Sequence, residues 1–167
     1  MDLTCFVEIP QGSRNKYELD EQRGVIKLDR HLFSSMVYPS DYGFLEETLT
    51  EDGARHLDAL VLVSEATFPG CRIDVRPIGI FQMRDEAGVD DKVLCVPLHD
   101  PEWAKVRELE DTSERLRDEI AHFFAVYKEL EPDRVTAIEG WAGRDVAEAE
   151  VAAARARYLE QAGQRGA

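Results

Sequence analysis

Residues 50–63, TEDGARHLDALVLV, form an acidic turn that leads directly into an apolar run. The apolar run predicts a buried strand over residues 57–63, which would hold Asp58 at its rim. Asp52 lies on the other side of the turn, so two carboxylates bracket it. Oxygen ligands beside a buried strand suit a hard divalent cation such as Mg²⁺, which retains several waters.

A second acidic turn, residues 85–92 (DEAGVDDK), precedes another apolar run at 93–96. Asp, Glu and Gly are common in solvent-exposed turns, so either turn alone is a weak signal. Three further segments, 16–18, 29–30 and 38–43, add cations, carboxylates and tyrosines. Together these features indicate a phosphate site with the two acidic turns facing one another.

The composition of the chain argues against some classes of binding partner. The chain has 167 residues and is most simply one domain, residues 1–167, with a sizeable core. Its net charge of -14 argues against nucleic acid and anionic membrane surfaces. No stretch approaches the roughly 20 apolar residues of a membrane span. Cys5, Cys71 and Cys95 lie in apolar runs without metal-type spacing, which predicts reduced core residues and a cytoplasmic location.

The order of predicted elements indicates the fold class. Strands are expected over residues 3–9, 16–20, 25–28, 57–63, 73–83, 93–97 and 135–141. Residues 30–50 are expected to be mostly irregular, and Pro77 predicts an edge strand or a bulge. One amphipathic helix is expected between residues 113 and 132, and another is marked by Ala147, Val151, Ala154 and Tyr158. Strands followed by helices predict an α+β fold, with a barrel or strongly curved sheet flanked by two helices.

A set of short motifs occurs in one order along nearly the whole chain. They are Lys16-Tyr17-Glu18, Asp29-Arg30, Met36-Val37-Tyr38-Pro39, Asp41-Tyr42-Gly43, Phe68-Pro69-Gly70, Arg76-Pro77-Ile78-Gly79, Asp85-Glu86-Ala87-Gly88, Asp90-Asp91-Lys92, His122-Phe123-Phe124 and Tyr127-Lys128. In these motifs the chain resembles the soluble family I inorganic pyrophosphatases of bacterial type. The resemblance implies an OB-like barrel with two helices, Mg²⁺, pyrophosphate as the substrate and a homo-oligomer, commonly a hexamer.

The resemblance also implies roles for individual residues. The implied metal ligands are Glu8, Asp52, Asp58, Asp85 and Asp90. The implied substrate-binding residues are Lys16, Glu18, Arg30, Tyr38, Tyr42, Lys92, Tyr127 and Lys128. Asp52, Asp85 and Tyr42 are the implied catalytic residues. Such a site suits hydrolysis of pyrophosphate to two phosphates, because metals and cations neutralise the substrate and acidify water.

The first acidic turn departs from the family pattern. The family signature is Asp-Gly-Asp-Pro-hydrophobic-Asp, whereas residues 52–58 read DGARHLD and are one residue longer. Counting forward puts Ala54 at the middle aspartate, and counting back from Asp58 puts Arg55 there. The leading hypothesis is Mg²⁺-dependent pyrophosphate hydrolysis with reduced activity. A redirected enzyme for an organic phosphate or diphosphate, and a non-catalytic diphosphate-binding paralogue, are the alternatives. The roles of Arg55 and His56 are left open.

Overall fold

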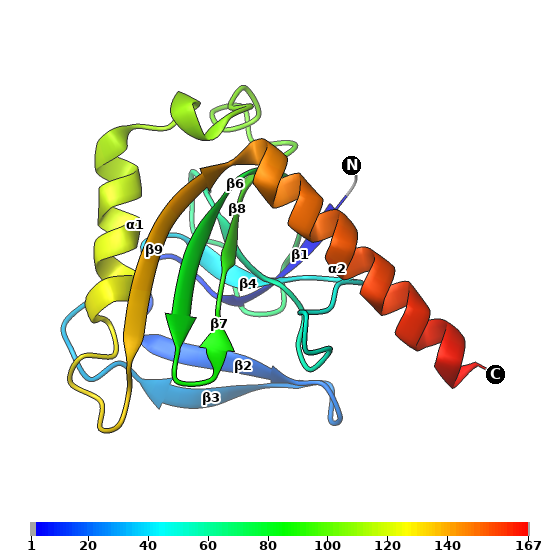
Figure 1. The fold of residues 1–167 in the computed structure, drawn as a ribbon. Helices are drawn as coiled ribbons and strands as arrows, with labels where there is room; N and C mark the ends of the chain where they lie inside the picture. The colour runs from blue at the N-terminus through cyan, green and yellow to red at the C-terminus, as the bar shows by residue number, and fades with distance from the viewer. Residues whose placement is uncertain (1–2, 167) are drawn as a thin grey trace.

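The computed structural model describes residues 3–166. Figure 1 shows a curved sheet with a short ribbon below it and two helices against it. The strands are β1 (Leu3–Ile9), β2 (Asn15–Asp20), β3 (Val25–His31), β4 (Asp41–Leu45), β5 (Asp58–Val61), β6 (Arg72–Asp85), β7 (Gly88–Val89), β8 (Lys92–Pro97) and β9 (Thr136–Gly143). The helices are the short 3₁₀ turn η1 (Leu109–Asp111), α1 (Glu114–Val126) and α2 (Arg144–Arg165).

Five strands close into a ring. The pairing path runs β1-β4-β5-β8-β6, and β6 pairs with β1 again. Within this ring β5 and β8 are parallel, with Asp58 opposite Lys92. The long strand β6 also carries β7 and β9 beyond the ring. The predicted OB-like barrel in an α+β fold is thus confirmed, and the parallel pair brings two predicted site residues side by side.

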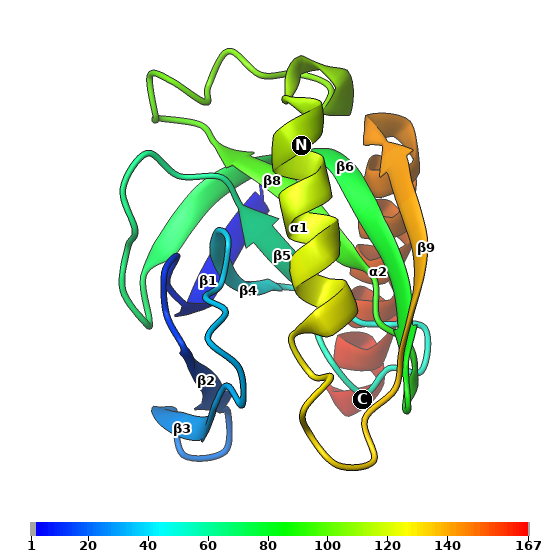
Figure 2. The same ribbon diagram turned by 90° about the vertical axis from the view of Figure 1, so that its left-hand side faces the viewer.

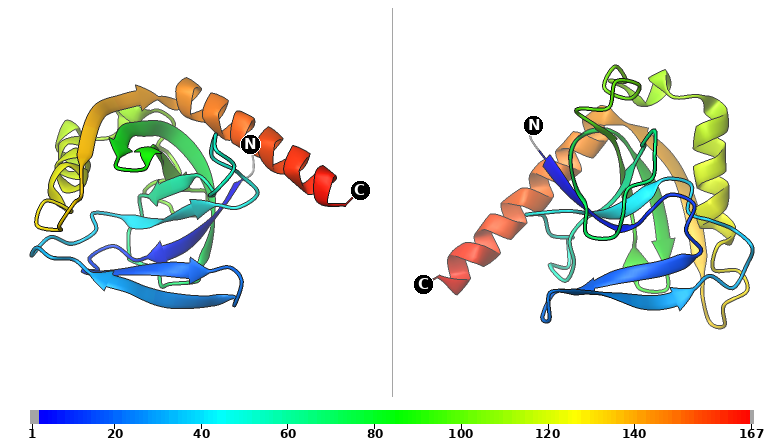
Figure 3. Two further views of the ribbon diagram at one scale, coloured as in Figure 1. Left: turned by 60° about the horizontal axis from the view of Figure 1, so that its bottom comes forward. Right: turned by 180° about the vertical axis from the view of Figure 1, so that it is seen from behind.

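The remaining two strands form a separate ribbon. β2 and β3 pair only with each other, antiparallel, with Lys16 opposite Arg30. In the left view of Figure 3 this ribbon lies below the ring strands, and β2 packs against β1. The ribbon therefore carries two predicted phosphate ligands toward the ring strands.

Two apolar clusters lie on opposite sides of the ring strands. Alternation along β5 and the residue after it sends Ala59 and Val61 to one cluster and Leu60 and Leu62 to the other. All five ring strands contribute to the first cluster, which α2 completes with small side chains such as Ala147. The second cluster packs under α1, which Figure 2 shows lying across the sheet. Each helix therefore covers a different apolar face, and the right view of Figure 3 shows α2 extending well beyond the ring.

The sequence places the start of α1 correctly. Ser113 is its N-cap and accepts a hydrogen bond from the backbone N–H of Leu116 at 3.1 Å. That contact satisfies one of the donors that the first turn of a helix leaves free. The helix ends at Val126, so Tyr127 and Lys128 follow directly from it. Both predicted ligands are thereby presented at the end of a packed helix.

Other expectations need correction. Residues 30–50 are less irregular than expected, because β3 reaches His31 and β4 spans Asp41–Leu45. All five β4 residues are buried, so the apolar and polar alternation that reveals a half-exposed strand is missing. Pro77 lies at a register shift within the central strand β6, so of its two predicted environments the bulge is found. Among residues 3–166, no helix is long and apolar enough to cross a membrane.

Candidate active site

A cavity of about 520 Å³ lies between the β2–β3 ribbon, the ring strands and the end of α1. Among its lining residues are Glu8, Lys16, Glu18, Arg30, Tyr42, Asp58, Asp85, Asp90, Lys92, Tyr127 and Lys128. These are the predicted site residues except Asp52 and Tyr38. Side chains from β1, β2, β3, β4, β5, β6 and β8 thus meet in one space, although they are far apart in sequence.

The ammonium group of Lys92 lies at the base of this cavity. Its Nζ is 2.8 Å from Asp58 Oδ2 and 2.7 Å from Asp90 Oδ1, and the residue is 1% exposed. A buried charge is tolerated when it is paired and hydrogen-bonded, as it is here. The parallel pairing of β5 with β8 places Asp58 beside Lys92, while Asp90 precedes β8 by two residues.

The pKa values of Asp58 and Asp90 shift in opposite directions in this environment. Burial opposes ionisation of Asp58, but Lys92 and the Tyr42 hydroxyl outweigh it and hold the pKa of Asp58 below its usual value. Burial dominates at Asp90, and with the neighbouring Asp58 it raises the pKa of Asp90. The attraction of these carboxylates in turn overcomes burial and raises the pKa of Lys92. Lys92 is therefore a permanent cation in the cavity floor.

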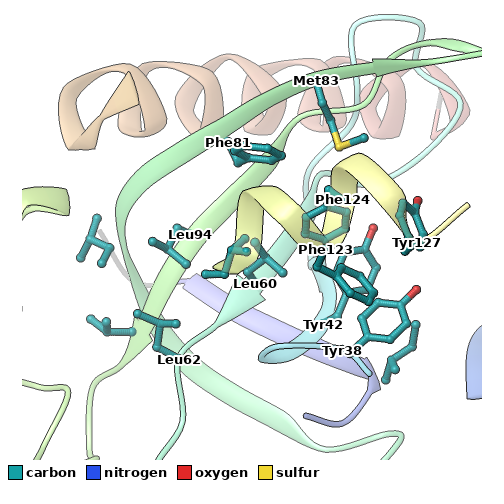
Figure 4. Close-up of a cluster of buried hydrophobic side chains, with 14 of the residues drawn as sticks. Tyr38, Tyr42, Leu60, Leu62, Phe81, Met83, Leu94, Phe123, Phe124 and Tyr127 are labelled. Carbon is teal, nitrogen blue, oxygen red and sulfur yellow. The ribbon is translucent and has the colours of Figure 1, made fainter. Parts of the chain in front are cut away.

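Aromatic side chains form one wall. The hydroxyl of Tyr42 donates to Asp58 Oδ2 at 2.8 Å. Tyr38 lies behind it, 1% exposed, with its ring centroid 4.8 Å from that of Phe123. Figure 4 shows the rings of Tyr38, Tyr42 and Tyr127 gathered beside the phenylalanines of α1. Tyr38 therefore supports the wall from within the apolar cluster, whereas Tyr42 and Tyr127 line the cavity.

The cations of the ribbon are held by carboxylates. Asp29 Oδ2 lies 3.1 Å from Lys16 Nζ and 2.6 Å from Arg30 Nη1. Glu131, buried after α1, pairs with Arg30 Nε at 2.6 Å. This ion pair ties the ribbon to the segment after the helix, while Arg30 Nε has no hydrogen-bond partner among the described residues. Glu131 received no role from the sequence, because it lies in an irregular segment before Pro132 with no motif spacing.

A further group of charges lies opposite the ribbon. Lys128 Nζ is 3.6 Å from Asp85 Oδ2 and 4.0 Å from Glu86 Oε1. Glu86 also pairs with Arg134 Nη1 at 2.7 Å. Burial disfavours the Glu86 anion, but hydrogen bonds from its own backbone N–H and Arg134, with the charge of Lys128, lower its pKa to about 2. Glu86 and Arg134 line the cavity too, and sequence reasoning gave neither a role.

Glu8 of β1 approaches the cavity from the ring. Its Oε2 accepts a hydrogen bond from the backbone N–H of Leu19 at 2.7 Å, which links the ring to the ribbon. Burial, with Asp58 and Glu18 nearby, raises the pKa of Glu8 to about 7, against the opposing effects of that N–H and Lys16. The protonation of Glu8 therefore changes near neutral pH.

The altered turn folds back on itself. The Asp52 carboxylate accepts hydrogen bonds from Thr50 Oγ1 at 2.6 Å and from the Ala54 backbone N–H at 3.0 Å. Asp52 lines a neighbouring cavity, also about 520 Å³, instead of the one that contains Lys92. Arg55, Asp58 and Asp90 line both spaces, so they form the boundary between them.

His56 lines both cavities, and its ring nitrogens are engaged by other groups. Its Nδ1 is 2.7 Å from the Thr48 carbonyl oxygen, and its Nε2 is 2.8 Å from Glu21 Oε1. Its ring stacks on Phe44 with centroids 4.8 Å apart. Both ring nitrogens thus have partners, and His56 fastens the turn to the tip of the β2–β3 ribbon.

The donor chemistry of the cavity fits a hard divalent cation. Asp58, Asp85 and Asp90 offer oxygen ligands in one space. Within the described residues, no three His, Cys, Asp or Glu side chains are gathered closely enough to hold a metal ion by themselves. A site with one or two carboxylates, completed by water and phosphate oxygens, is the arrangement that Mg²⁺ prefers.

Sequence comparisons agree with this geometry. The family model described as inorganic pyrophosphatase matches residues 5–159. An inorganic pyrophosphatase of Streptomyces coelicolor is 53% identical over 163 residues, covering 98% of this chain and 99% of the relative. One from Methanosarcina acetivorans is 54% identical over 158 residues, covering 95% and 93%.

Solved structures agree as well. The inorganic pyrophosphatase of Thermus thermophilus superposes with a TM-score of 0.91 at 42% identity, covering 95% of this chain and 91% of that one. The Helicobacter pylori enzyme gives 0.91 at 36% identity, covering 95% and 94%. The closed barrel, with paired cations and carboxylates in one cavity, is the architecture of an enzyme that binds phosphate groups. This chain belongs to the inorganic pyrophosphatase family.

Proposed function

We propose that the protein hydrolyses inorganic pyrophosphate to two phosphates and that Mg²⁺ is the metal it uses. The observation that carries this proposal is the single cavity in which Lys16, Arg30, Lys92 and Lys128 face Asp58, Asp85 and Asp90. Relatives named inorganic pyrophosphatase, 53% and 54% identical over most of the chain, support this proposal. They do not favour a redirected substrate.

In this mechanism the protein contributes position and charge. Lys16, Arg30 and Lys128, which line the cavity, bind phosphate oxygens, and the hydroxyls of Tyr42 and Tyr127 are further ligands. Phosphoryl transfer depends chiefly on such positioning and on neutralisation of the charge that develops on the oxygens. Lys92 keeps Asp58 and Asp90 close together despite their like charge, since its ammonium lies between them.

Asp58, Asp85 and Asp90 would offer oxygens to Mg²⁺, with water and phosphate oxygens completing the coordination, and the metal would supply further positive charge to the phosphates and acidify the attacking water. Glu8 and Asp52 remain predicted ligands. For Asp52 this role requires release from Thr50 and Ala54, whose hydrogen bonds now hold its carboxylate. Glu18, on the ribbon, and Tyr38, behind the aromatic wall, complete the polar site.

Phosphate release from pyrophosphate tests the proposal. We expect turnover with Mg²⁺ and none with a chelator. A variant whose residues 53–57 are rebuilt as Gly-Asp-Pro-Leu should be faster by up to about 10²- to 10⁴-fold, because a positioned base contributes on that order. Arg23→Gln is a control at an exposed position on the ribbon. Absence of turnover in both the natural and the rebuilt protein, each folded, would overturn the proposal.

We propose further that the protein is a cytoplasmic homo-oligomer. Exposed apolar side chains support association, among them Leu28 at 57% and Phe33 at 53% exposed. The free cysteines Cys5, Cys71 and Cys95 support a reducing compartment. Light scattering of the purified protein would measure the number of subunits, for which the family resemblance predicts six, and a monomer at all concentrations would contradict association.

A further inference from the structure

Arg55 is positioned at the boundary between the two cavities. Its Nη1 lies 3.7 Å from Asp90 Oδ1, and its side chain is 48% exposed. It lines the cavity that contains Lys92 as well as the neighbouring one. The guanidinium therefore stands beside the carboxylates Asp58 and Asp90, to which the proposed function assigns a divalent cation.

The turn fixes the backbone of Arg55 firmly. The Thr50 N–H donates to the Arg55 carbonyl at 2.8 Å, and the Arg55 N–H donates to Thr50 Oγ1 at 3.2 Å. Gly53 makes the tight reversal with φ of 70°, a conformation that glycine adopts without strain. These contacts hold the peptide without using the side chain. The guanidinium is thus free to respond to the charges in front of it.

Those charges are the carboxylates of Asp58 in β5, Asp85 in β6 and Asp90, which lies between β7 and β8. Burial would disfavour the guanidinium cation, but Asp58, Asp90, Tyr42 and Asp85 outweigh it and raise the pKa of Arg55. A divalent cation placed among the same carboxylates would be repelled by Arg55 at short range. A phosphate entering the cavity would instead be attracted, because a guanidinium matches phosphate oxygens in charge and geometry.

The ion pair with Asp90 does not by itself explain the position of Arg55. At 3.7 Å and half exposed, such a pair contributes little to folding. Asp90 already has Lys92 at 2.7 Å, a shorter and buried contact. Arg55 thus adds a second cation to carboxylates that are already paired.

We propose that the guanidinium of Arg55 is a fixed cation of the candidate active site, which weakens binding of a divalent cation to the free protein and binds a phosphate group of the substrate directly. This inference rests on the proposed function of the same cavity. It predicts two effects of opposite sign when the charge is removed. Affinity for the metal rises, and affinity for a diphosphate in the absence of metal falls.

The experiment compares Arg55→Gln, Arg55→Lys and Arg84→Gln with the natural protein. Arg84 is a matched control, because it lines only the neighbouring cavity and pairs with Glu139 at 2.8 Å. Mn²⁺ binding is measured by electron paramagnetic resonance without substrate. Binding of imidodiphosphate, a pyrophosphate analogue, is measured by calorimetry in a chelating buffer. Neither readout depends on turnover.

For Arg55→Gln we expect Mn²⁺ to bind about tenfold more tightly and imidodiphosphate about tenfold more weakly, the order expected for one unit charge at this range in a partly solvated site. Arg55→Lys should keep most of both effects, and Arg84→Gln should change neither. Loss of both affinities in Arg55→Gln, or no change in either, would overturn the inference. Because hydrolysis is assayed separately, the two proposals can fail independently. The natural protein can lack turnover while Arg55 shows both binding effects, and it can turn over pyrophosphate while Arg55 shows neither.

Discussion

At the scale of single residues, Lys92 organises the cavity. It is 1% exposed and contacts Asp58 and Asp90 within 2.8 Å. Removing one member of a buried charge group leaves the others uncompensated, which is usually more costly than the group is stabilising. The carboxylates therefore depend on Lys92 for their proximity, and any metal must bind beside a cation that is already present.

Glu8 is a second single residue with a large effect, because it makes the free energy of unfolding depend on pH. Its pKa is about 7 in the folded protein, against 4.5 for an unperturbed glutamate. Between these values the folded state holds a proton that the unfolded state has lost, so stability falls as the pH rises through this window. Glu8→Gln removes this cost. We expect it to stabilise the metal-free protein by about 2 kcal/mol at about pH 8 and much less at about pH 4.

Urea unfolding of both proteins with a chelator, at each pH, measures this difference. The chelator is needed because a cation near Glu8 would favour its charged form. Glutamine retains an oxygen for the Leu19 N–H, so the link between ring and ribbon is preserved. An equal effect at both pH values would show that Glu8 ionises normally.

At the scale of elements, β1 and β4 approach unusually closely at Gly43. A Cβ built there would lie 1.8 Å from the carbonyl oxygen of Phe6, a backbone atom that cannot move alone. Gly43→Ala must therefore separate two ring strands next to Tyr42. We expect a loss of at least about 3 kcal/mol in the free energy of unfolding, at the upper end for an overpacked site.

The matched control is Gly143→Ala. A Cβ at Gly143 meets nothing within 4 Å, and its φ of -75° suits any residue. Its cost should stay below about 1 kcal/mol, the scale of an N-cap change. Thermal unfolding of both variants tests the contrast, and similar midpoints would mean that β4 shifts to accommodate the methyl group.

At the scale of the whole molecule, excess negative charge favours cation binding. The net charge is -14, and the cavity gathers carboxylates from several elements. A ligand that binds only the folded state stabilises it according to its concentration relative to its dissociation constant. At a hundredfold excess over that constant, Mg²⁺ should raise the unfolding midpoint by about 5–10 °C.

NaCl at matched ionic strength separates specific binding from general screening. Screening weakens repulsion among surface carboxylates, so NaCl should give a smaller rise. Differential scanning calorimetry with each salt makes the comparison. If both salts raise the midpoint equally, the cavity has no specific cation site in the free protein.

Local sequence patterns were enough to predict most strands, the start of α1 and the family. Short apolar runs bounded by turns predicted most strands, Ser113 marked the start of α1, and the motif order indicated the family. All but two of the predicted site residues line one cavity. β4 was missed because burial of both its faces removes alternation. Glu131 was missed because its contact with Arg30 crosses from a loop after α1 to the ribbon.

The direction of each side chain in the altered turn depends on contacts between segments that are distant in the sequence. The residues 52–58 leave two alignments open, since sequence spacing cannot say which side chain points inward. In the fold, Asp52 is held by Thr50 and Ala54, while Arg55 faces Asp90. The physical reason is that this choice depends on carboxylates brought together by the parallel pairing of β5 with β8, and that pairing joins segments more than thirty residues apart in the chain.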